Sequence, residues 1–351
     1  MTTQAASHLA SLTRAGIDAE GELLRRPRAV DYVLMLLGVL ILFEALEEVF
    51  RLGGPPWIYQ TWVHDFVTLF ASVLVLARAI YEPKTRGAWL AIGAAMLLWS
   101  FGSIGWSIAY EGRAVVPYPT FADVFWLLWY PLMAIGIGLL IRVRIKRFEL
   151  HRWMDGVAVV LLVLAAGFAI VIQPVARETL QGVTATVVDF SYPVLDILLI
   201  GAILGVYGLL GWRPDAMWVL LGLGILATTI ADATFAIQEA HGLPETQPYD
   251  FVWTLGAVLI ACAAWVTSPA AQDVHGEVTG LRAIALVLVA QAVAAGIQVY
   301  AVFGELAKSE RIITLAVLVI TSVQIVLARP RPAKSGSPPP ASDGSPSDST
   351  D

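Results

Sequence analysis

The sequence predicts an all-α integral membrane protein with about ten membrane-spanning helices. Hydrophobic residues make up 58% of the 351-residue chain, charged residues only 14%, and the mean hydropathy is +0.73. Soluble domains carry about a quarter charged residues. Apolar stretches of roughly 18 to 23 residues recur along the chain, and each is long enough to cross a ~30 Å hydrocarbon core. Little chain is left for a water-soluble domain.

Three regions follow from this pattern. Residues 1–28 are polar and form a cytoplasmic N-terminal segment, residues 29–328 form the ten-helix membrane domain, and residues 329–351 form a disordered cytoplasmic tail rich in Pro, Ser and Asp. In chain order, the predicted spans cover about 30–50, 61–80, 88–110, a fourth that starts within 115–132 and ends by 141, 154–172, 189–210, 216–238, 250–267, 281–303 and 311–328.

The distribution of charge predicts the orientation of these spans. The most basic loop, residues 142–152, holds four arginines and one lysine, Lys146. Short loops rich in Lys and Arg stay in the cytoplasm. The other loops on that side are also basic, whereas the alternate loops carry glutamates such as Glu111, Glu178 and Glu305. Both termini are therefore expected in the cytoplasm.

Several even-numbered spans begin in the same way on the outer side. An early acid follows a proline at Asp65, Asp123 and Asp196, and the pattern D-x-x-W occurs at Asp123 and again at Asp250. Successive acids are separated by 54 to 73 residues, about the length of a helical hairpin, which predicts hairpin pseudo-repeats. A simpler interpretation of Asp123, Asp196 and Asp250 is helix capping, because a carboxylate accepts hydrogen bonds from free amides at a helix start.

Two acids lie deeper in the predicted spans, Glu44 in the first and Asp232 in the seventh. An ionised side chain inside hydrocarbon is costly, so it is expected to face the bundle interior, a partner or water. Glu47, Glu48 and Arg51 are spaced for an interfacial ion pair instead. The predicted outward-facing site combines acids with aromatic side chains: Glu44, Asp65, Asp123, Asp196, Asp232, Asp250, Trp126 and Trp253.

Motifs for metal or cofactor chemistry are weak. His64 and His241 are the weak candidates for a metal ligand, since no HExxH or i, i+4 pair of histidines supports them. Cys262 is the single cysteine, and the sequence has no P-loop, GxSxG or kinase motif. No cofactor and no catalytic residue is predicted, and an enzyme is the less favoured class. The basic loop fits topology and anionic lipid better than nucleic acid, so the predicted partner is the lipid bilayer.

A family resemblance adds to this interpretation. The segments PTFAD at 119–123, YP at 130–131, MDG at 154–156 and YPVLD at 192–196, followed by Asp232, Gly242, Asp250 and Trp253, resemble the multi-span N-terminal membrane region of bacterial, especially actinobacterial, GGDEF and EAL signalling proteins. The resemblance spans roughly the third to the eighth helix. It implies a sensor in the bacterial inner membrane. After residue 328 only the tail follows, so a stand-alone sensor module without the output domain is expected.

The leading hypothesis is thus a bacterial inner-membrane sensory or regulatory protein. Its acidic and aromatic site binds a cation or small ligand, and a cytoplasmic signalling partner chain reads the resulting helix shifts. A secondary transporter is the alternative, because repeats and intramembrane acids are equally expected there. A membrane enzyme that uses an outer carboxylate is a third, more distant possibility.

Overall fold

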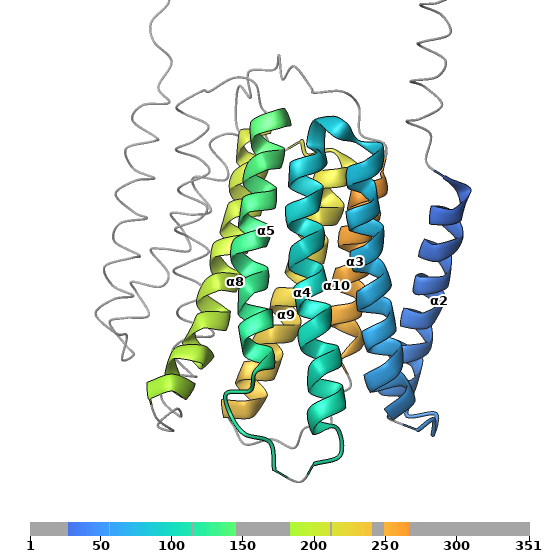
Figure 1. The fold of residues 1–351 in the computed structure, drawn as a ribbon, viewed down its shortest axis with the longest axis vertical. Helices are drawn as coiled ribbons and strands as arrows, with labels where there is room; N and C mark the ends of the chain where they lie inside the picture. The colour runs from blue at the N-terminus through green and yellow to red at the C-terminus, as the bar shows by residue number, and fades with distance from the viewer. Residues whose placement is uncertain are drawn as a thin grey trace, which may run out of the picture.

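The computed structural model describes residues 27–55, 57–113, 115–144, 183–210, 213–240 and 249–266, and within these ranges the chain is helical with no strand (Figure 1). The helices are α2 Arg28–Phe50, the π-helical segment η1 Trp57–Val63, α3 His64–Tyr81, the 3-10 turn η2 Pro83–Thr85, α4 Arg86–Tyr110, α5 Ala122–Arg144, α8 Val183–Leu209, α9 Ala216–Ala240 and α10 Phe251–Trp265.

Six helical segments in the described part of the chain are long and apolar enough to cross a membrane, and they match predicted spans one to four, six and seven. This confirms the all-helical class and is compatible with a multi-pass membrane protein. The predicted eighth span corresponds to α10, which has only 15 residues. The predicted spans at 154–172, 281–303 and 311–328 and both terminal segments lie outside the described residues, so the count of ten and the orientation stay predictions.

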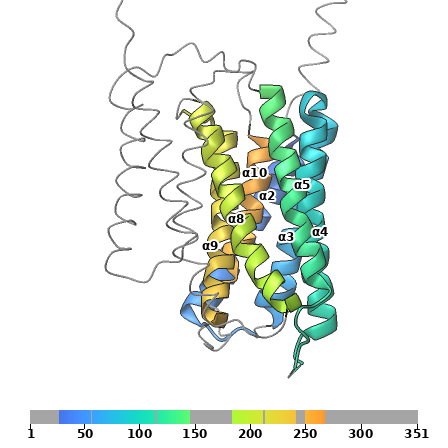
Figure 2. The ribbon, with the colours of Figure 1, turned by 90° about the vertical axis from the view of Figure 1, so that its left-hand side faces the viewer.

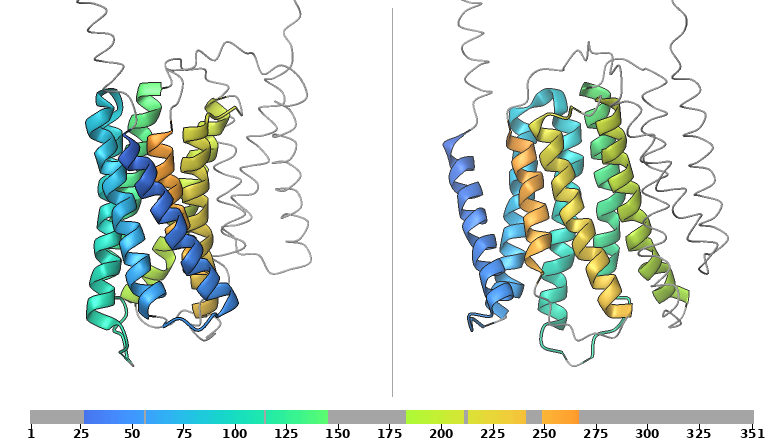
Figure 3. Two further views of the ribbon diagram at one scale, coloured as in Figure 1. Left: turned by 90° about the vertical axis from the view of Figure 1, so that its right-hand side faces the viewer. Right: turned by 180° about the vertical axis from the view of Figure 1, so that it is seen from behind.

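The helices form a ring with one helix outside it. In sequence, α3, α4, α5, α8, α9 and α10 each pack against the next, and α10 returns to α3 and closes the ring. Helix α2 packs against α3 and α10 from outside, where Figure 3 shows it in front of the bundle. Figure 2 shows the opposite side, where α8 lies against α9 and α5. The ring interior is a continuous apolar core that includes Trp89, Met96, Met133, Leu221 and Ile225.

Small residues allow the closest helix contacts. A Cβ placed on Gly256 of α10 would lie 2.9 Å from the carbonyl oxygen of Gly224 on α9 and 2.6 Å from Thr228 Oγ1. A Cβ on Gly224 would in turn lie 2.8 Å from the Gly256 carbonyl oxygen. Helices in lipid associate largely through van der Waals contact, which is strongest where small side chains let two backbones approach.

Helix α8 begins earlier than the sequence indicates. It starts at Val183, so Pro193 and Asp196 lie in the helix interior and not in its first turn. The capping interpretation of Asp196 is therefore wrong. The apolar segment before Asp189 continues the helix, and an internal proline is tolerated in membrane helices where neighbouring groups satisfy the freed carbonyl.

Candidate functional site

Acidic side chains gather at one end of the bundle, which we call the acidic end. Helices α2 and α4 finish there, and α3, α5, α8 and α10 begin there (Figure 1). The structure divides the predicted site residues into two groups. The carboxyl bridge is Asp196, Tyr130 and Asp232. The second group, which we call the α2–α3–α10 cluster, consists of Glu44, Glu48, His64, Asp65 and Asp250.

The carboxyl bridge is held by one phenol. The Tyr130 hydroxyl of α5 lies 3.1 Å from Asp196 Oδ1 on α8 and 3.3 Å from Asp232 Oδ2 on α9. The Trp253 indole of α10 donates to Asp232 Oδ1 at 2.7 Å, and the Thr229 hydroxyl donates to Asp196 Oδ1 at 3.3 Å. Tyr130 and Asp196 are buried. Four helices thus contribute to one polar group inside an apolar ring.

Asp123 lies beside this bridge and has a structural role. Its Oδ2 accepts hydrogen bonds from the Thr120 amide at 2.7 Å and the Thr120 hydroxyl at 2.9 Å, which fixes the loop that leads into α5. Its Oδ1 accepts from the Tyr192 hydroxyl of α8 at 2.8 Å. The local bonds agree with an organising role at the helix start, and the Tyr192 bond ties α5 to α8.

The α2–α3–α10 cluster is centred on Glu44, which is fully buried. Glu44 Oε1 lies 3.2 Å from His64 Nδ1, an ion pair when the imidazole is protonated, and Oε2 accepts from the Thr254 hydroxyl at 2.8 Å. Glu48, one turn further along α2, accepts from the backbone amide of Phe251 at 3.1 Å. The deep acid Glu44 therefore faces the bundle, as expected from the cost of burying a charge in lipid.

Three carboxylate oxygens of this cluster are buried without a hydrogen-bond partner among the described residues: Glu48 Oε1, Asp65 Oδ2 and Asp250 Oδ1. Asp250 occupies the N-cap position of α10, yet its side chain makes no capping hydrogen bond. The capping interpretation is wrong for Asp250 as well. Burial raises the pKa of the Asp250 carboxyl to about 7; the nearby His64 opposes the rise and Glu44 adds to it.

Two further predictions need correction. Trp126 does not join either acidic group, because its indole donates to Ser103 Oγ on α4 at 3.3 Å. Glu47 Oε2 accepts from the Gly54 amide at 3.0 Å, and within the described ranges neither Glu47 nor Glu48 forms an ion pair with Arg51. The absence of an ion pair with Arg51 is explained by the loop geometry, because Arg51 takes a left-handed conformation (φ 51°) that ends α2.

The metal interpretation gains no geometric support. Within the residues that the structure describes, no three His, Cys, Asp or Glu side chains are placed to hold one metal ion. His64 instead contacts Glu44 and packs edge-on against Trp99, with ring centroids 6.1 Å apart. His241 lies outside the described residues.

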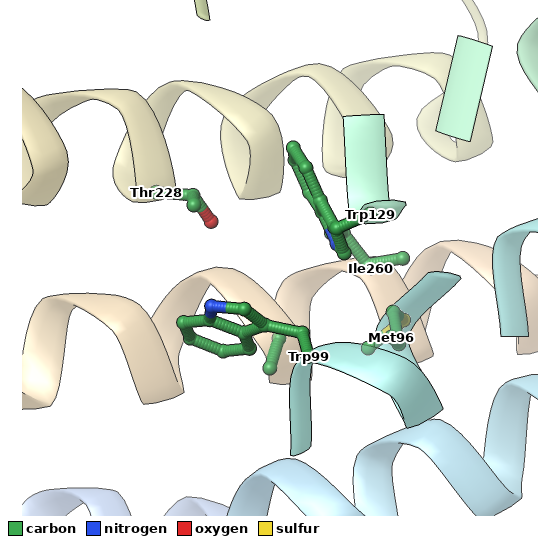
Figure 4. Close-up of a pocket in the computed structure, with 6 residues that line it drawn as sticks. Met96, Trp99, Trp129, Thr228 and Ile260 are labelled. Atoms are coloured by element: carbon green, nitrogen blue, oxygen red, sulfur yellow. The ribbon is translucent and has the colours of Figure 1, made fainter. Parts of the chain in front are cut away.

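A small apolar pocket lies in the ring interior (Figure 4). Its walls come from four helices, α4, α5, α9 and α10. The lining residues are Met96, Trp99, Trp129, Thr228, Ala257 and Ile260. Its volume of about 10 Å³ is close to the minimum for one water molecule. The pocket is therefore too small to hold an organic ligand.

Sequence reasoning did not assign a role to Tyr130, Tyr192, Thr229 or Thr254. A signal exists for the tyrosines, because Tyr130 follows Asp123 by seven residues and Tyr192 precedes Asp196 by four. Both spacings put the phenol and the acid on one helix face. No local pattern marks the two threonines, which are common in membrane helices.

Comparisons with known proteins give no match to a protein family, to a characterised protein or to a solved structure.

Proposed function

We propose that this chain is a sensory or regulatory protein of the bacterial inner membrane whose acidic end binds a cation at the carboxyl bridge. The observation that carries the proposal is the Tyr130 hydroxyl shared by Asp196 and Asp232. A phenol has one proton to donate. It can satisfy one carboxylate, and its oxygen lone pair then faces the other.

A bound cation resolves this conflict. Asp196 is buried and Asp232 partly buried. Two such carboxylates close to one hydroxyl repel each other, and a bound cation, a proton included, removes the repulsion. Because the three groups come from α5, α8 and α9, occupancy of the bridge changes the force that holds these helices together. Such a change in helix packing is what a cytoplasmic partner chain would read.

The test is thermal unfolding of the purified full-length protein in nanodiscs. The probes are Na⁺, K⁺, Mg²⁺ and tetramethylammonium at constant pH and ionic strength, followed by pH alone. We expect at least one of these cations to raise the unfolding midpoint at constant pH, and Asp232→Asn to abolish that shift because the amide removes one negative charge without changing the shape of the side chain.

Asp31→Asn is the matched control. Asp31 is exposed near the opposite end of α2, and its replacement is expected to leave the cation response unchanged. A wild-type midpoint indifferent to every cation and to pH, or a cation response at constant pH that survives both Asp232→Asn and Asp196→Asn, would refute the carboxyl bridge as the binding site.

A secondary transporter is the second candidate, favoured by one observation. The carboxyl bridge joins side chains of separate helices, as would be expected of a site that helix movements expose alternately to either side of a membrane. Cation flux into proteoliposomes, lost in Asp232→Asn, would support transport. Cation-dependent stability without flux supports the sensory function.

A further inference from the structure

The α2–α3–α10 cluster contains more carboxylate oxygens than hydrogen-bond donors. Glu44 has a partner for each oxygen, His64 on one and Thr254 on the other. Glu48 and Asp65 are each only 4% exposed, and each keeps one oxygen with no partner among the described residues. The free oxygen of Asp250 completes the set. An unpartnered buried carboxylate oxygen is costly when it carries charge.

The elements packed around these groups bring more negative than positive charge. Glu44, His64 and Asp250 act electrostatically on Glu48, whereas His64 and Glu111 act on Asp65. Tyr59 of η1 lies near Glu48, Glu47 and Arg51. His64 is the one cation among the groups acting directly on Glu48 and Asp65, and its hydrogen bond commits it to Glu44. Glu48, Asp65 and Asp250 therefore have no counter-charge of their own in the described structure.

We propose that Glu48, Asp65 and Asp250 are proton-binding carboxyl groups at the acidic end, separate from the carboxyl bridge. A hydronium ion from the adjoining solution gives its proton to a carboxylate oxygen, an O–H bond forms, and the negative charge disappears with release of water. The new O–H group also supplies a donor to a cluster that lacks donors. A proton needs no cavity, and the described residues hold no three ligands arranged for a metal ion.

Proton release from this site would loosen α10. Glu48 on α2 accepts from the first amide of α10, and Thr254 of α10 donates to Glu44. When Glu48 and Asp250 are ionised, like charges repel where α2 meets the start of α10, and the contacts at the start of α10 are strained. Protonation closes this junction and deprotonation opens it. The inference does not depend on a cation at the carboxyl bridge.

Infrared difference spectroscopy of the full chain in nanodiscs tests the proposal directly. The spectra compare about pH 5 with about pH 8, an interval in which a buried carboxyl group titrates but an exposed one is ionised throughout. We expect a protonated-carboxyl stretching band that disappears at the higher pH. Glu48→Gln and Asp65→Asn should each remove part of this band, whereas Asp31→Asn should leave it whole.

Thermal unfolding separates this site from the carboxyl bridge. Glu48→Gln mimics the protonated side chain, so its unfolding midpoint should fall less than that of the wild type between the two pH values, while a cation response at Asp232 persists. If neither Glu48→Gln nor Asp65→Asn changes the band, or if the band responds to Na⁺ or Mg²⁺ at constant pH and not to pH, the proton site is refuted. Should one variant fail to fold, the other decides the outcome.

Discussion

Tyr130 connects three helices of the ring through one side chain. Its hydroxyl reaches Asp196 and Asp232, and its ring packs edge-on against Trp129 at 4.9 Å and against Tyr192 at 6.3 Å. The phenol therefore connects α5 to α8 and α9 through hydrogen bonds and aromatic contacts at once. Removing the hydroxyl leaves the aromatic ring of residue 130 in place, so the change in stability measures the hydrogen bonds of the hydroxyl alone.

Tyr130→Phe is expected to destabilise the protein by about 1–3 kcal/mol, because Asp196 and Asp232 lose their shared donor. The midpoint of thermal unfolding in nanodiscs measures the effect. Tyr32→Phe is the control: Tyr32 is 67% exposed on α2, and its hydroxyl should contribute within about 0.5 kcal/mol. Equal midpoints for the two variants would contradict the role assigned to the bridge.

Asp250 gives a second prediction, in the pH dependence of stability. Its folded-state pKa of about 7 exceeds the ordinary value of 3.8, so the folded protein binds this proton more tightly than the unfolded chain does. The stabilising effect is complete below 3.8 and is lost as the pH rises to about 7. Unfolding midpoints should fall over this interval, with a contribution from Asp250 of at most about 1.4 kcal/mol per pH unit.

Asp250→Asn should flatten this profile and leave the stability at high pH no lower than that of the wild type. Asp31→Asn should keep the wild-type profile. A profile that Asp250→Asn leaves equally steep would show that other groups cause the pH dependence.

At the residue scale, the sequence could predict which acids matter but not how they are grouped. The cost of a charge in lipid correctly predicted that Glu44 faces the bundle. Capping was a reasonable interpretation of Asp196 and Asp250 because helix starts favour aspartate, yet Asp196 is buried inside α8 and Asp250, which is partly buried, makes no capping hydrogen bond. Trp253 and Thr254 are consecutive, but they bind Asp232 and Glu44, which are far apart in sequence. Such contacts depend on tertiary packing.

Among the elements, α10 connects the two acidic groups. Its first turns bind Glu48 and Glu44 of the α2–α3–α10 cluster on one side and Asp232 of the carboxyl bridge on the other. Its far end is also fixed, since the Trp265 indole donates to the Leu74 carbonyl oxygen at 2.8 Å and Arg78 lies over the same ring. The position of α10 therefore responds to the charge state of both groups.

The contact between α9 and α10 yields the third prediction. Gly256→Ala places a methyl group 2.6 Å from Thr228 Oγ1 and 2.9 Å from a backbone carbonyl oxygen, and the latter cannot rotate away. We expect a loss of about 1–3 kcal/mol from overpacking, measured by the unfolding midpoint. Gly138→Ala on α5 is the control, because nothing lies within 4 Å of its added Cβ and alanine favours the helix. A Gly256→Ala protein as stable as Gly138→Ala would contradict the close contact.

Helix boundaries show where sequence patterns reach their limit. Apolar length alone predicted α2, α4 and α9 to within a few residues. The start of α8 was predicted too late because proline and aspartate together suggested a helix start, whereas continuous packing against α5 and α9 extends the helix through both residues. The preference of a residue for a helix start is a weak predictor of the boundary where the helix packs against neighbours on both sides.

At the scale of the whole molecule, the ring of six helices, with α2 outside it, places the carboxyl bridge and the α2–α3–α10 cluster near one end. Composition predicted the helical membrane class, and alternating loops predicted that these acids share a side. Ring closure through α10 had no counterpart in the sequence, because contacts between α3 and α10 join segments that lie far apart in the chain.

The orientation of the molecule gives the fourth prediction. In a Cys262→Ala background, Tyr118→Cys in the α4–α5 loop should react with a membrane-impermeant maleimide in intact cells. Lys84→Cys in η2, at the opposite end, should react only after permeabilisation. The reverse pattern would place the acidic end in the cytoplasm and overturn the orientation.

The depth of Glu48 has an electrical consequence. Glu48 lies two residues before Phe50, where α2 ends. Taking the helix ends as the surfaces of the hydrocarbon core, this is about 3 Å along the axis, or roughly a tenth of a ~30 Å barrier. A proton that binds to Glu48 would cross that part of the transmembrane voltage, worth about 0.2 kcal/mol per 100 mV. Its affinity should therefore change about 1.5-fold with each such step, so that membrane potential adds a second, weaker input to that of acidity.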